Sequence, residues 1–459
     1  MASIGTGNQA TSEIGSFLGL TIPTHLPTLM TTDPRATSYL PTAQLTTAPQ
    51  LSGWTDIPPE RQGVDFGQTD YFKYILYDSE VLTDLHLCVR LDGLNPGPGG
   101  VNPRYPDDVL CHSVERITFV FGSDLQVLEG DAIHFNSLMN EDEQTMVRES
   151  QLRGYNLSVG QRIENAQSPK WYYLRIPFWW TLRNSDAWHQ YVLQRLTRIV
   201  ITWRSPNGIL QQDVANTQPT PMSGGQYIMD HFLRFRVTAL SEGTKQEFIR
   251  RMASNGMAGQ LYLVEDIQRL THQIHPGVHR HVIQLNTFTK FADNLRFVIR
   301  SVSTLTPNFL DNDRFYTLPI ETATLNISGR RFMPPTDYVW MTHAVDESLW
   351  KGNPEYAIYN IPFSDFPAMV GSAVGGIDFS NAASPQLTLT TREFPESCMV
   401  DFFLQCYNYV RQTIVNNQSG AELVQVVRPR PEVGTVRGLF FSWENIQKSQ
   451  WISSSLVTC

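Results

Sequence analysis

The chain has 459 residues, enough for about three average domains or two large β domains. Charged residues make up 17%, below the roughly 25% typical of soluble domains, whereas aromatic residues reach 11%. The formal net charge is −9 and no run of Lys or Arg is present, which argues against direct nucleic-acid binding. This composition suits a large β protein with a neutral surface, or a subunit with extensive contacts.

Cysteine usage and the N-terminal sequence indicate the compartment. The five cysteines are odd in number and widely spaced, so they do not indicate a disulfide framework, and we expect a reducing compartment. The N-terminus has no basic start followed by an apolar core, so we expect no signal peptide. No apolar run approaches the roughly 18 residues that a membrane helix needs.

The first 50 residues contain only three charges, Glu13, Asp33 and Arg35, and are rich in Thr, Pro, Ser and Ala. Such a segment cannot form a core of its own. It is either disordered or an arm, and its scattered apolar residues favour an arm that docks on a neighbour. We assign residues 1–60 to this N-terminal arm.

A first β region begins near Tyr71. Apolar residues alternate with polar ones over residues 84–91, and the alternation returns over 117–121, 199–203 and 233–239. The aromatic run from Trp171 to Trp180 is broken by Pro177, which is typical of an edge strand or a bend. We assign residues 61–242 to a first β-sandwich.

Long insertions separate these strands. Residues 131–159 have mixed polarity and are expected to hold short helices, and residues 205–226, rich in Pro, Gly and Gln, are expected to form an exposed loop. The acidic triplet Glu141-Asp142-Glu143 could be a divalent-ion site, but adjacent carboxylates in a loop more often form a solvated face.

The centre of the chain has helix-start chemistry. Thr244 and Glu247 match a capping box, followed by the apolar residues Phe248, Ile249 and Met252. Gly256 and Gly259 interrupt a continuous helix, so Leu261–Leu270 is expected as a second helical segment. We assign residues 243–280 to a helical linker between two sandwiches.

A second β region begins near Val282. Alternating segments occur at 295–300, 325–327, 387–389, 400–406 and 436–443, separated by turn clusters such as Pro334-Pro335. Many short strands with regular turns predict a sandwich or barrel over residues 281–459. The glycine-rich Gly371–Gly376 segment lacks the Lys-Ser/Thr ending of a phosphate loop, so we interpret it as a β-turn.

Four histidines form the densest ligand-like cluster, namely His272, His275, His279 and His281. Zinc accepts imidazole ligands, and a pH-sensitive contact is an alternative. Pro276 and Gly277 interrupt any helical face, and neither carboxylate nor cysteine completes the set nearby, so a histidine-rich loop is favoured. No nucleophile elbow or other catalytic constellation is present, and we predict no catalytic, cofactor or metal site.

The first β region also concentrates tryptophan, at Trp171, Trp179, Trp180, Trp188 and Trp203. These side chains could form a sugar-binding platform or anchor an interface. The simplest interpretation is a sandwich core, which we favour.

Taken in order, several segments resemble the major capsid proteins of nucleocytoplasmic large DNA viruses, above all those of iridovirus type. The matching segments are Leu174–Arg183, Arg198–Arg204, Lys245–Met252, Phe291–Ile299, Tyr356–Phe363 and Leu387–Thr390. Gly371-Ser372 and Asp378-Phe379-Ser380 match the family's glycine-serine loop loosely, with a longer spacing. The resemblance runs from about Phe66 to the C-terminus, whereas the first 60 residues do not match.

The resemblance implies an all-β fold of two tandem eight-stranded jelly-roll β-sandwiches, a double jelly roll, with short helices in the linker and loops. It implies a non-enzymatic capsid subunit that forms homotrimeric pseudo-hexagonal capsomers and the icosahedral shell of a virion assembled in the host cytoplasm. Its implied partners are other copies of the chain, minor capsid and penton proteins, and an internal membrane beneath the shell, without direct contact to nucleic acid.

Two other functions stay open at this point. One is a scaffold protein of the same fold that is lost on maturation. The other is a carbohydrate-binding β-sandwich protein or a glycoside hydrolase, which the lack of a signal peptide and of a convincing carboxylate pair disfavours.

Overall fold

The structure is a computed structural model. It describes residues 50–74, 80–121, 124–140, 143–182, 188–189, 197–240, 246, 250, 260–306, 308–310, 313–344, 357–364, 376–412 and 424–427.

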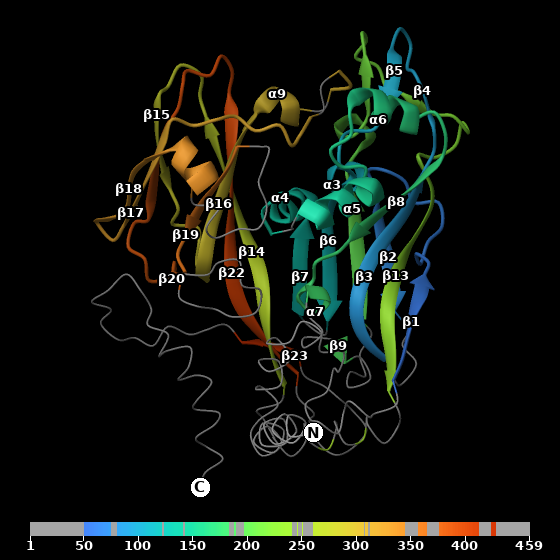
Figure 1. The fold of residues 1–459 in the computed structure, drawn as a ribbon, viewed down its shortest axis with the longest axis horizontal. Helices are drawn as coiled ribbons and strands as arrows, with labels where there is room; N and C mark the ends of the chain where they lie inside the picture. Colours follow the sequence, from blue (N-terminus) through green and yellow to red (C-terminus); the bar gives the residue numbers. More distant parts are fainter. Residues whose placement is uncertain are drawn as a thin grey trace, which may run out of the picture.

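Two β-sandwiches stand side by side with their long strands roughly parallel (Figure 1). The main strands of the first are β1 (Gln50–Ile57), β2 (Thr69–Tyr74), β3 (Glu80–Leu91), β6 (Val114–Phe121), β7 (Asp124–Glu129), β8 (Lys170–Arg175), β10 (Thr197–Trp203) and β13 (Ile228–Leu240). Those of the second are β14 (Gln260–Ile274), β15 (Arg280–Gln284), β16 (Phe291–Ser301), β17 (Thr322–Ile327), β18 (Arg330–Asp337), β19 (Ile358–Pro362), β21 (Gln386–Thr390) and β22 (Cys398–Gln412).

Both sandwiches have the same strand order. Sheet A (β1-β13-β3-β8) faces sheet B (β2-β10-β6-β7), and sheet E (β14-β22-β16-β19) faces sheet F (β15-β21-β17-β18). Numbered along the chain within each sandwich, the strands run first-eighth-third-sixth in sheets A and E and second-seventh-fourth-fifth in sheets B and F. Eight antiparallel strands in two sheets with these crossovers form a jelly roll, so the prediction of two tandem jelly rolls is confirmed.

Short strands and helices lie outside these four main sheets or extend them. Ribbon C pairs β4 (Leu94–Asn95) with β12 (Thr220–Pro221), and ribbon D pairs β5 (Val101–Arg104) with β11 (Gln211–Asp213). Single short strands extend the sheets, namely β9 (Trp188–His189) beside β3, β20 (Ile377–Asp378) beside β16 and β23 (Val424–Val427) beside β22. The helices are α3 (Val109–Ser113), α4 (Gly130–Asn140), α5 (Glu143–Arg153), α6 (Val159–Asn165), α7 (Trp179–Leu182), η4 (Pro206–Gly208), α9 (Val302–Leu305) and η6 (Trp340–Ala344).

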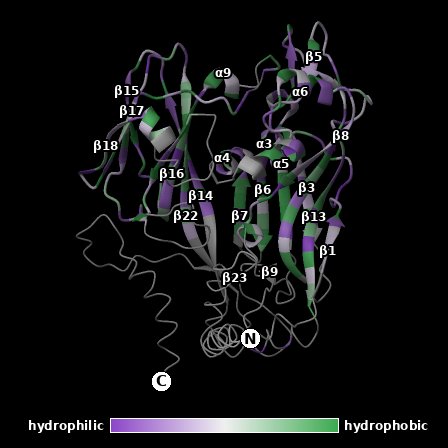
Figure 2. Cartoon of the chain, viewed as in Figure 1, coloured by the Kyte–Doolittle hydropathy of each residue, from purple (hydrophilic) through white to green (hydrophobic). Residues whose placement is uncertain are grey.

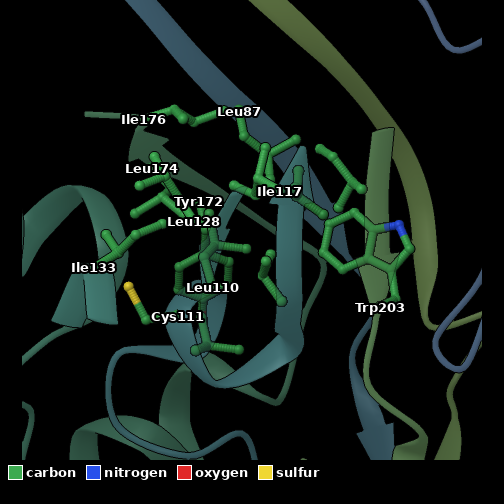
Figure 3. Packing of buried hydrophobic residues seen from close by; sticks show 14 of the residues in the cluster. Leu87, Leu110, Cys111, Ile117, Leu128, Ile133, Tyr172, Leu174, Ile176 and Trp203 are labelled. Carbon is green, nitrogen blue, oxygen red and sulfur yellow. The ribbon is translucent and has the colours of Figure 1, made fainter. Parts of the chain in front are cut away.

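The alternation predicted from the sequence creates the first core. Leu85, Leu87 and Leu91 of β3 are buried, and the strand shows bands of opposite hydropathy along its length (Figure 2). Figure 3 shows Leu87 in the same cluster as Ile117 of β6 and Trp203 of β10. Trp179 and Trp180 are buried there too, which confirms the core interpretation for these three tryptophans.

Several local predictions hold. Residues 131–159 hold short helices, as expected: α4 begins one residue ahead of this segment, α5 lies within it, and α6 begins at its end. The run from Trp171 to Trp180 starts in β8, which is an edge strand of sheet A, and bends before α7.

Three local predictions are wrong. Residues 260–274 form strand β14 instead of a helical segment, because they pair with β22 in unbroken register from Gln260 to Ile274. Residues 50–57 of the expected arm form β1, paired with β13. Residues 205–226 are not simply an exposed loop, because they supply β11 and β12 to the ribbons and bury Leu210 and Gln212.

Other predictions fall partly or wholly outside the described residues. Of the capping-box helix, Gln246 and Arg250 are described and are helical. The strand expected at 436–443, residues 371–375 of the glycine-rich turn, and Glu141 and Asp142 lie outside the described part of the chain.

Sheet E is covered on both faces. One face packs on sheet F, and the other lies against α4 and β7 of the first sandwich (Figure 1). All of β16 is therefore buried, from Phe291 to Ser301. The core of the first sandwich takes in Val298, Ile358 and Phe403 from the second, so the two jelly rolls share apolar surface.

Candidate functional site, a charged junction between the two sandwiches

The described residues show no catalytic constellation, and their most elaborate polar arrangement lies where the sandwiches meet. We call it the charged junction and define it by Glu129, Asp131, Arg204, Arg269, Arg300, Arg314 and Asp401. It contains four cations and three anions, contributed by both sandwiches.

Asp131 is the centre of this junction. It lies in the first turn of α4, directly after β7, and its side chain is fully buried. Arg204, at the end of β10, donates to its Oδ1 at 2.7 Å, and Arg300 of β16 donates to its Oδ2 at 3.1 Å. Arg314, ahead of β17, donates from Nε to Oδ1 at 3.0 Å. One carboxylate therefore binds arginines from both sandwiches.

The charges around Asp131 control its protonation. Burial alone would raise the pKa of Asp131, but Arg204, Arg314 and Arg300 outweigh burial and hold the pKa well below its usual range. The carboxylate is therefore ionised at any physiological pH.

Asp401 of β22 forms the second anionic centre. Arg300 donates from Nε to its Oδ2 at 3.0 Å, and Arg269 of β14 donates from Nη2 to its Oδ1 at 2.7 Å. Arg269 also bonds to Glu129, the last residue of β7. Arg300 and Arg269 thereby connect Asp401 to the first sandwich.

Aromatic packing by α4 and the loop before β17 surrounds these charges. The ring of His134 stacks on Phe315 with centroids 3.7 Å apart and planes 5° apart. Phe135 approaches Phe403 of β22 with a centroid distance of 5.8 Å. Asn136 accepts a hydrogen bond from Arg296 of β16. Three successive residues of α4 thus contact the second sandwich.

The physical effect of this junction is to fix one orientation. Buried ion pairs contribute little net stability compared with apolar packing, but they cost several kcal/mol when one partner is missing. Any rotation of one sandwich on the other would leave arginines or carboxylates buried without partners. The two jelly rolls should therefore behave as one rigid unit.

Local sequence patterns do not predict this charged junction. Arg296 and Arg300 alternate with apolar residues in β16, a pattern typical of a strand with one solvated face. Their face is instead covered by α4, which lies about 165 residues earlier in the chain. A contact across so long a stretch of chain cannot be predicted from the local sequence. Local sequence does not distinguish a solvated arginine from one in a buried cluster.

The histidine cluster lies at one end of the second sandwich. His272 is on β14, His281 is on β15, and the other two occupy the turn between them. His279 pairs with Glu393 at 3.1 Å, and His281 lies 3.3 Å from the hydroxyl of Thr391. Within the described residues, no group of three or more His, Cys, Asp or Glu side chains is arranged to hold a metal ion.

The cysteines of the described residues are buried thiols. Cys88, Cys111, Cys398 and Cys406 are buried, and burial raises the pKa of the Cys88 thiol to about 12. No helix in the described part of the chain is both long enough and apolar enough to cross a bilayer.

Two jelly rolls of identical strand order, locked together in one chain, define a double jelly-roll protein. Three solved capsid structures share this arrangement. The PBCV-1 virus capsid subunit superposes with a TM-score of 0.64 at 12% identity, over 80% of this chain and 95% of that one. The Faustovirus major capsid protein gives 0.63 at 10%, over 79% and 91%. PBCV-1 VP54, fitted into a reconstruction of the virophage Sputnik, gives 0.63 at 12%, over 79% and 95%.

At these identities the likeness shows the fold, and it confirms at that level the resemblance to major capsid proteins. No protein-family model and no curated protein matches the sequence.

Proposed function

We propose that this chain is a major capsid protein, a structural subunit without enzymatic activity in the icosahedral shell of a large double-stranded DNA virus. The observation that supports this most is the pair of identical jelly rolls joined by the charged junction, in the fold of the PBCV-1 and Faustovirus capsid proteins.

The proposed assembly is a homotrimer. Because each chain has two lobes of the same topology, three chains provide six similar lobes, which suits a pseudo-hexagonal capsomer. Such capsomers pack edge to edge, and the low content of charged residues, 17%, suits side walls in extensive contact.

The proposed partners follow from the same role. Other capsomers, minor capsid proteins, penton proteins and an internal membrane would adjoin the shell, and residues 1–49 would contribute an arm to these contacts. The net charge of −9 supports a shell that does not bind the viral DNA directly. The proposed location is the virion, after assembly in the host cytoplasm.

Negative-stain electron microscopy of the purified full-length protein tests this function. Class averages viewed along the strands should show a closed ring of six lobes. Particles with only two lobes at concentrations well above those of the virus-producing cell would contradict the proposal. Mass spectrometry of purified mature virions separates a shell protein, which is present in them, from a scaffold protein, which is absent.

A further inference from the structure

The packing within one chain suggests how two chains meet. The outer face of sheet E, the face turned away from sheet F, is covered by one segment of the first sandwich, β7 followed by α4. Glu129 ends β7 and bonds to Arg269, and Phe135 and Asn136 of α4 contact β22 and β16. The fifth strand of the first jelly roll, β7, and the helix after it, α4, thus cover the outer face of sheet E in the second jelly roll.

Sheet A occupies the same topological position in the first sandwich that sheet E occupies in the second. Part of its outer face is open, where the side chain of Arg234 on β13 is 40% exposed. Trp54 of β1 is 53% exposed there, and it contacts His86 of β3 with ring centroids 5.7 Å apart. The equivalent face of sheet E is fully buried along β16.

The composition of this open face is that of an interface. Trp171 of β8 stacks on Tyr173 and meets Phe232 of β13 edge-on, at centroid distances of 6.3 and 5.4 Å. Arg234 lies over the ring of Phe232 at 5.2 Å. Tryptophan, tyrosine and arginine are the residues most enriched at the energetic centres of protein interfaces.

The second sandwich has its own counterpart of the β7–α4 segment. Its fifth strand is β18, which is followed by η6. Every residue of β18 is exposed or half-buried. Three apolar side chains are exposed where β18 leads into η6, namely Tyr338, Val339 and Trp340, the last of which is 59% exposed. Asp337 ends β18 in the position that Glu129 has at the end of β7.

We propose that the β18–η6 segment of one chain docks on the outer face of sheet A of a second copy, with Trp340 packing among its aromatic residues. This inference rests on the proposed function and specifies its trimer contact. In Figure 1 the two surfaces lie at opposite sides of the molecule, β18 on the left and β1 on the right. A contact between two different surfaces of the same chain is head-to-tail. It closes into a ring of three when each copy is rotated by one third of a turn relative to the next.

The first experiment measures the mass of full-length variants by light scattering after size exclusion. Trp340→Ala and Trp54→Ala should each weaken the association roughly 30-fold or more, as expected for a buried interface tryptophan, and shift the mass towards 52.2 kDa. Tyr316→Ala is the matched control, because Tyr316 is 51% exposed and belongs to neither surface. Circular dichroism melting curves check that each variant is folded.

The second experiment locates the contact without removing it. In a Cys459→Ser background, chains with Ser52→Cys on β1 are mixed with chains with Val339→Cys and treated with a short bis-maleimide. The mixture should give covalent dimers, each single variant alone should give none, and the double variant should give a covalent trimer. Cross-linking of either single variant with itself would show a symmetric contact and overturn the inference.

The outcomes separate this inference from the proposed function. A wild-type trimer that persists in both tryptophan variants, without cross-linking, overturns the contact and leaves the capsid function standing. A wild-type monomer at all concentrations overturns both.

Discussion

Asp131 shows how one residue can hold two domains together. Its carboxylate is fully buried and binds arginines from both sandwiches, and its pKa lies well below the usual range despite burial. If the carboxylate is lost, Arg300 cannot bond to water in its place, because its own side chain is also fully buried.

Replacing Asp131 with asparagine should therefore destabilise the protein strongly. The substitution keeps the shape but leaves arginines buried without a counter-charge, which typically costs about 3–5 kcal/mol. Urea unfolding at neutral pH measures it. Asp56→Asn is the control, since Asp56 and Arg234 form a half-exposed pair of the kind worth about 0–1 kcal/mol. Equal losses in the two variants would contradict the role of the junction.

His112 should make stability depend on pH. Burial, with Arg204 and Arg314 nearby, lowers the pKa of His112 to about 3. Its Nδ1 lies 2.8 Å from the carbonyl of Asp107, and its Nε2 accepts the backbone N–H of Arg314 at 3.2 Å, which only a neutral ring can do. The pKa of a histidine in the unfolded chain is 6.5. Between this value and about 3, the unfolded chain binds a proton that the folded chain does not, so stability falls as the pH falls.

The expected loss from this histidine is up to about 1.4 kcal/mol per pH unit between about pH 6 and about pH 4. His112→Gln cannot take up the proton, so its unfolding free energy should change less steeply over that range, although it starts lower. Arg153 and His134 outweigh burial and hold the pKa of Asp108 at about 2, so the stability that this carboxylate contributes is lost mainly below about pH 4, under the range that reports on His112. Parallel pH profiles for the wild type and the variant would refute this assignment.

At the scale of elements, the position of α4 depends on a glycine. A Cβ atom on Gly130, the first residue of α4, would lie 2.2 Å from the backbone oxygen of Cys111 and 2.3 Å from that of Val114. Such contacts with backbone cannot be relieved by moving a side chain. Helix α4 can therefore enter the junction only because residue 130 has no side chain.

Gly130→Ala should push the start of α4 away from α3 and β6, disturb its place in the charged junction and cost about 1–3 kcal/mol, the range for overpacking. Gly160→Ala in α6 is the matched control, because a Cβ atom there meets nothing within 4 Å. That variant should be neutral or gain up to about 1 kcal/mol from helix propensity. Thermal unfolding of both variants checks the difference, and a neutral Gly130→Ala would show that α4 is not constrained in this way.

The elements also show what the sequence can predict. The strict alternation of β3 identified the strand and its buried face, because period-two patterns have one simple solution in a half-buried sheet. The helical segment expected at Leu261–Leu270 is wrong, because the capping box at Thr244 favoured a helix that resumes after the interruption at Gly256 and Gly259, whereas the conformation of β14 is set by its pairing with β22. That partner begins more than a hundred residues later, and no local pattern reports it.

At the scale of the whole molecule, the two-sandwich architecture was predictable and the junction was not. Turn spacing and alternation indicated two β regions, and the order of weak motifs indicated a double jelly roll. The junction depends on which outer face meets which segment. Arg269, Asp401 and Asp131 become neighbours only through the packing of complete sandwiches, so their charges looked like ordinary surface charges in the sequence.

The central claim is that this rigid two-lobed chain assembles with copies of itself into six-lobed units. The solution mass of the purified full-length protein, measured by light scattering coupled to size exclusion, tests it most directly. A stable species of three times 52.2 kDa is the predicted result. A species of 52.2 kDa that persists at high concentration would contradict the claim.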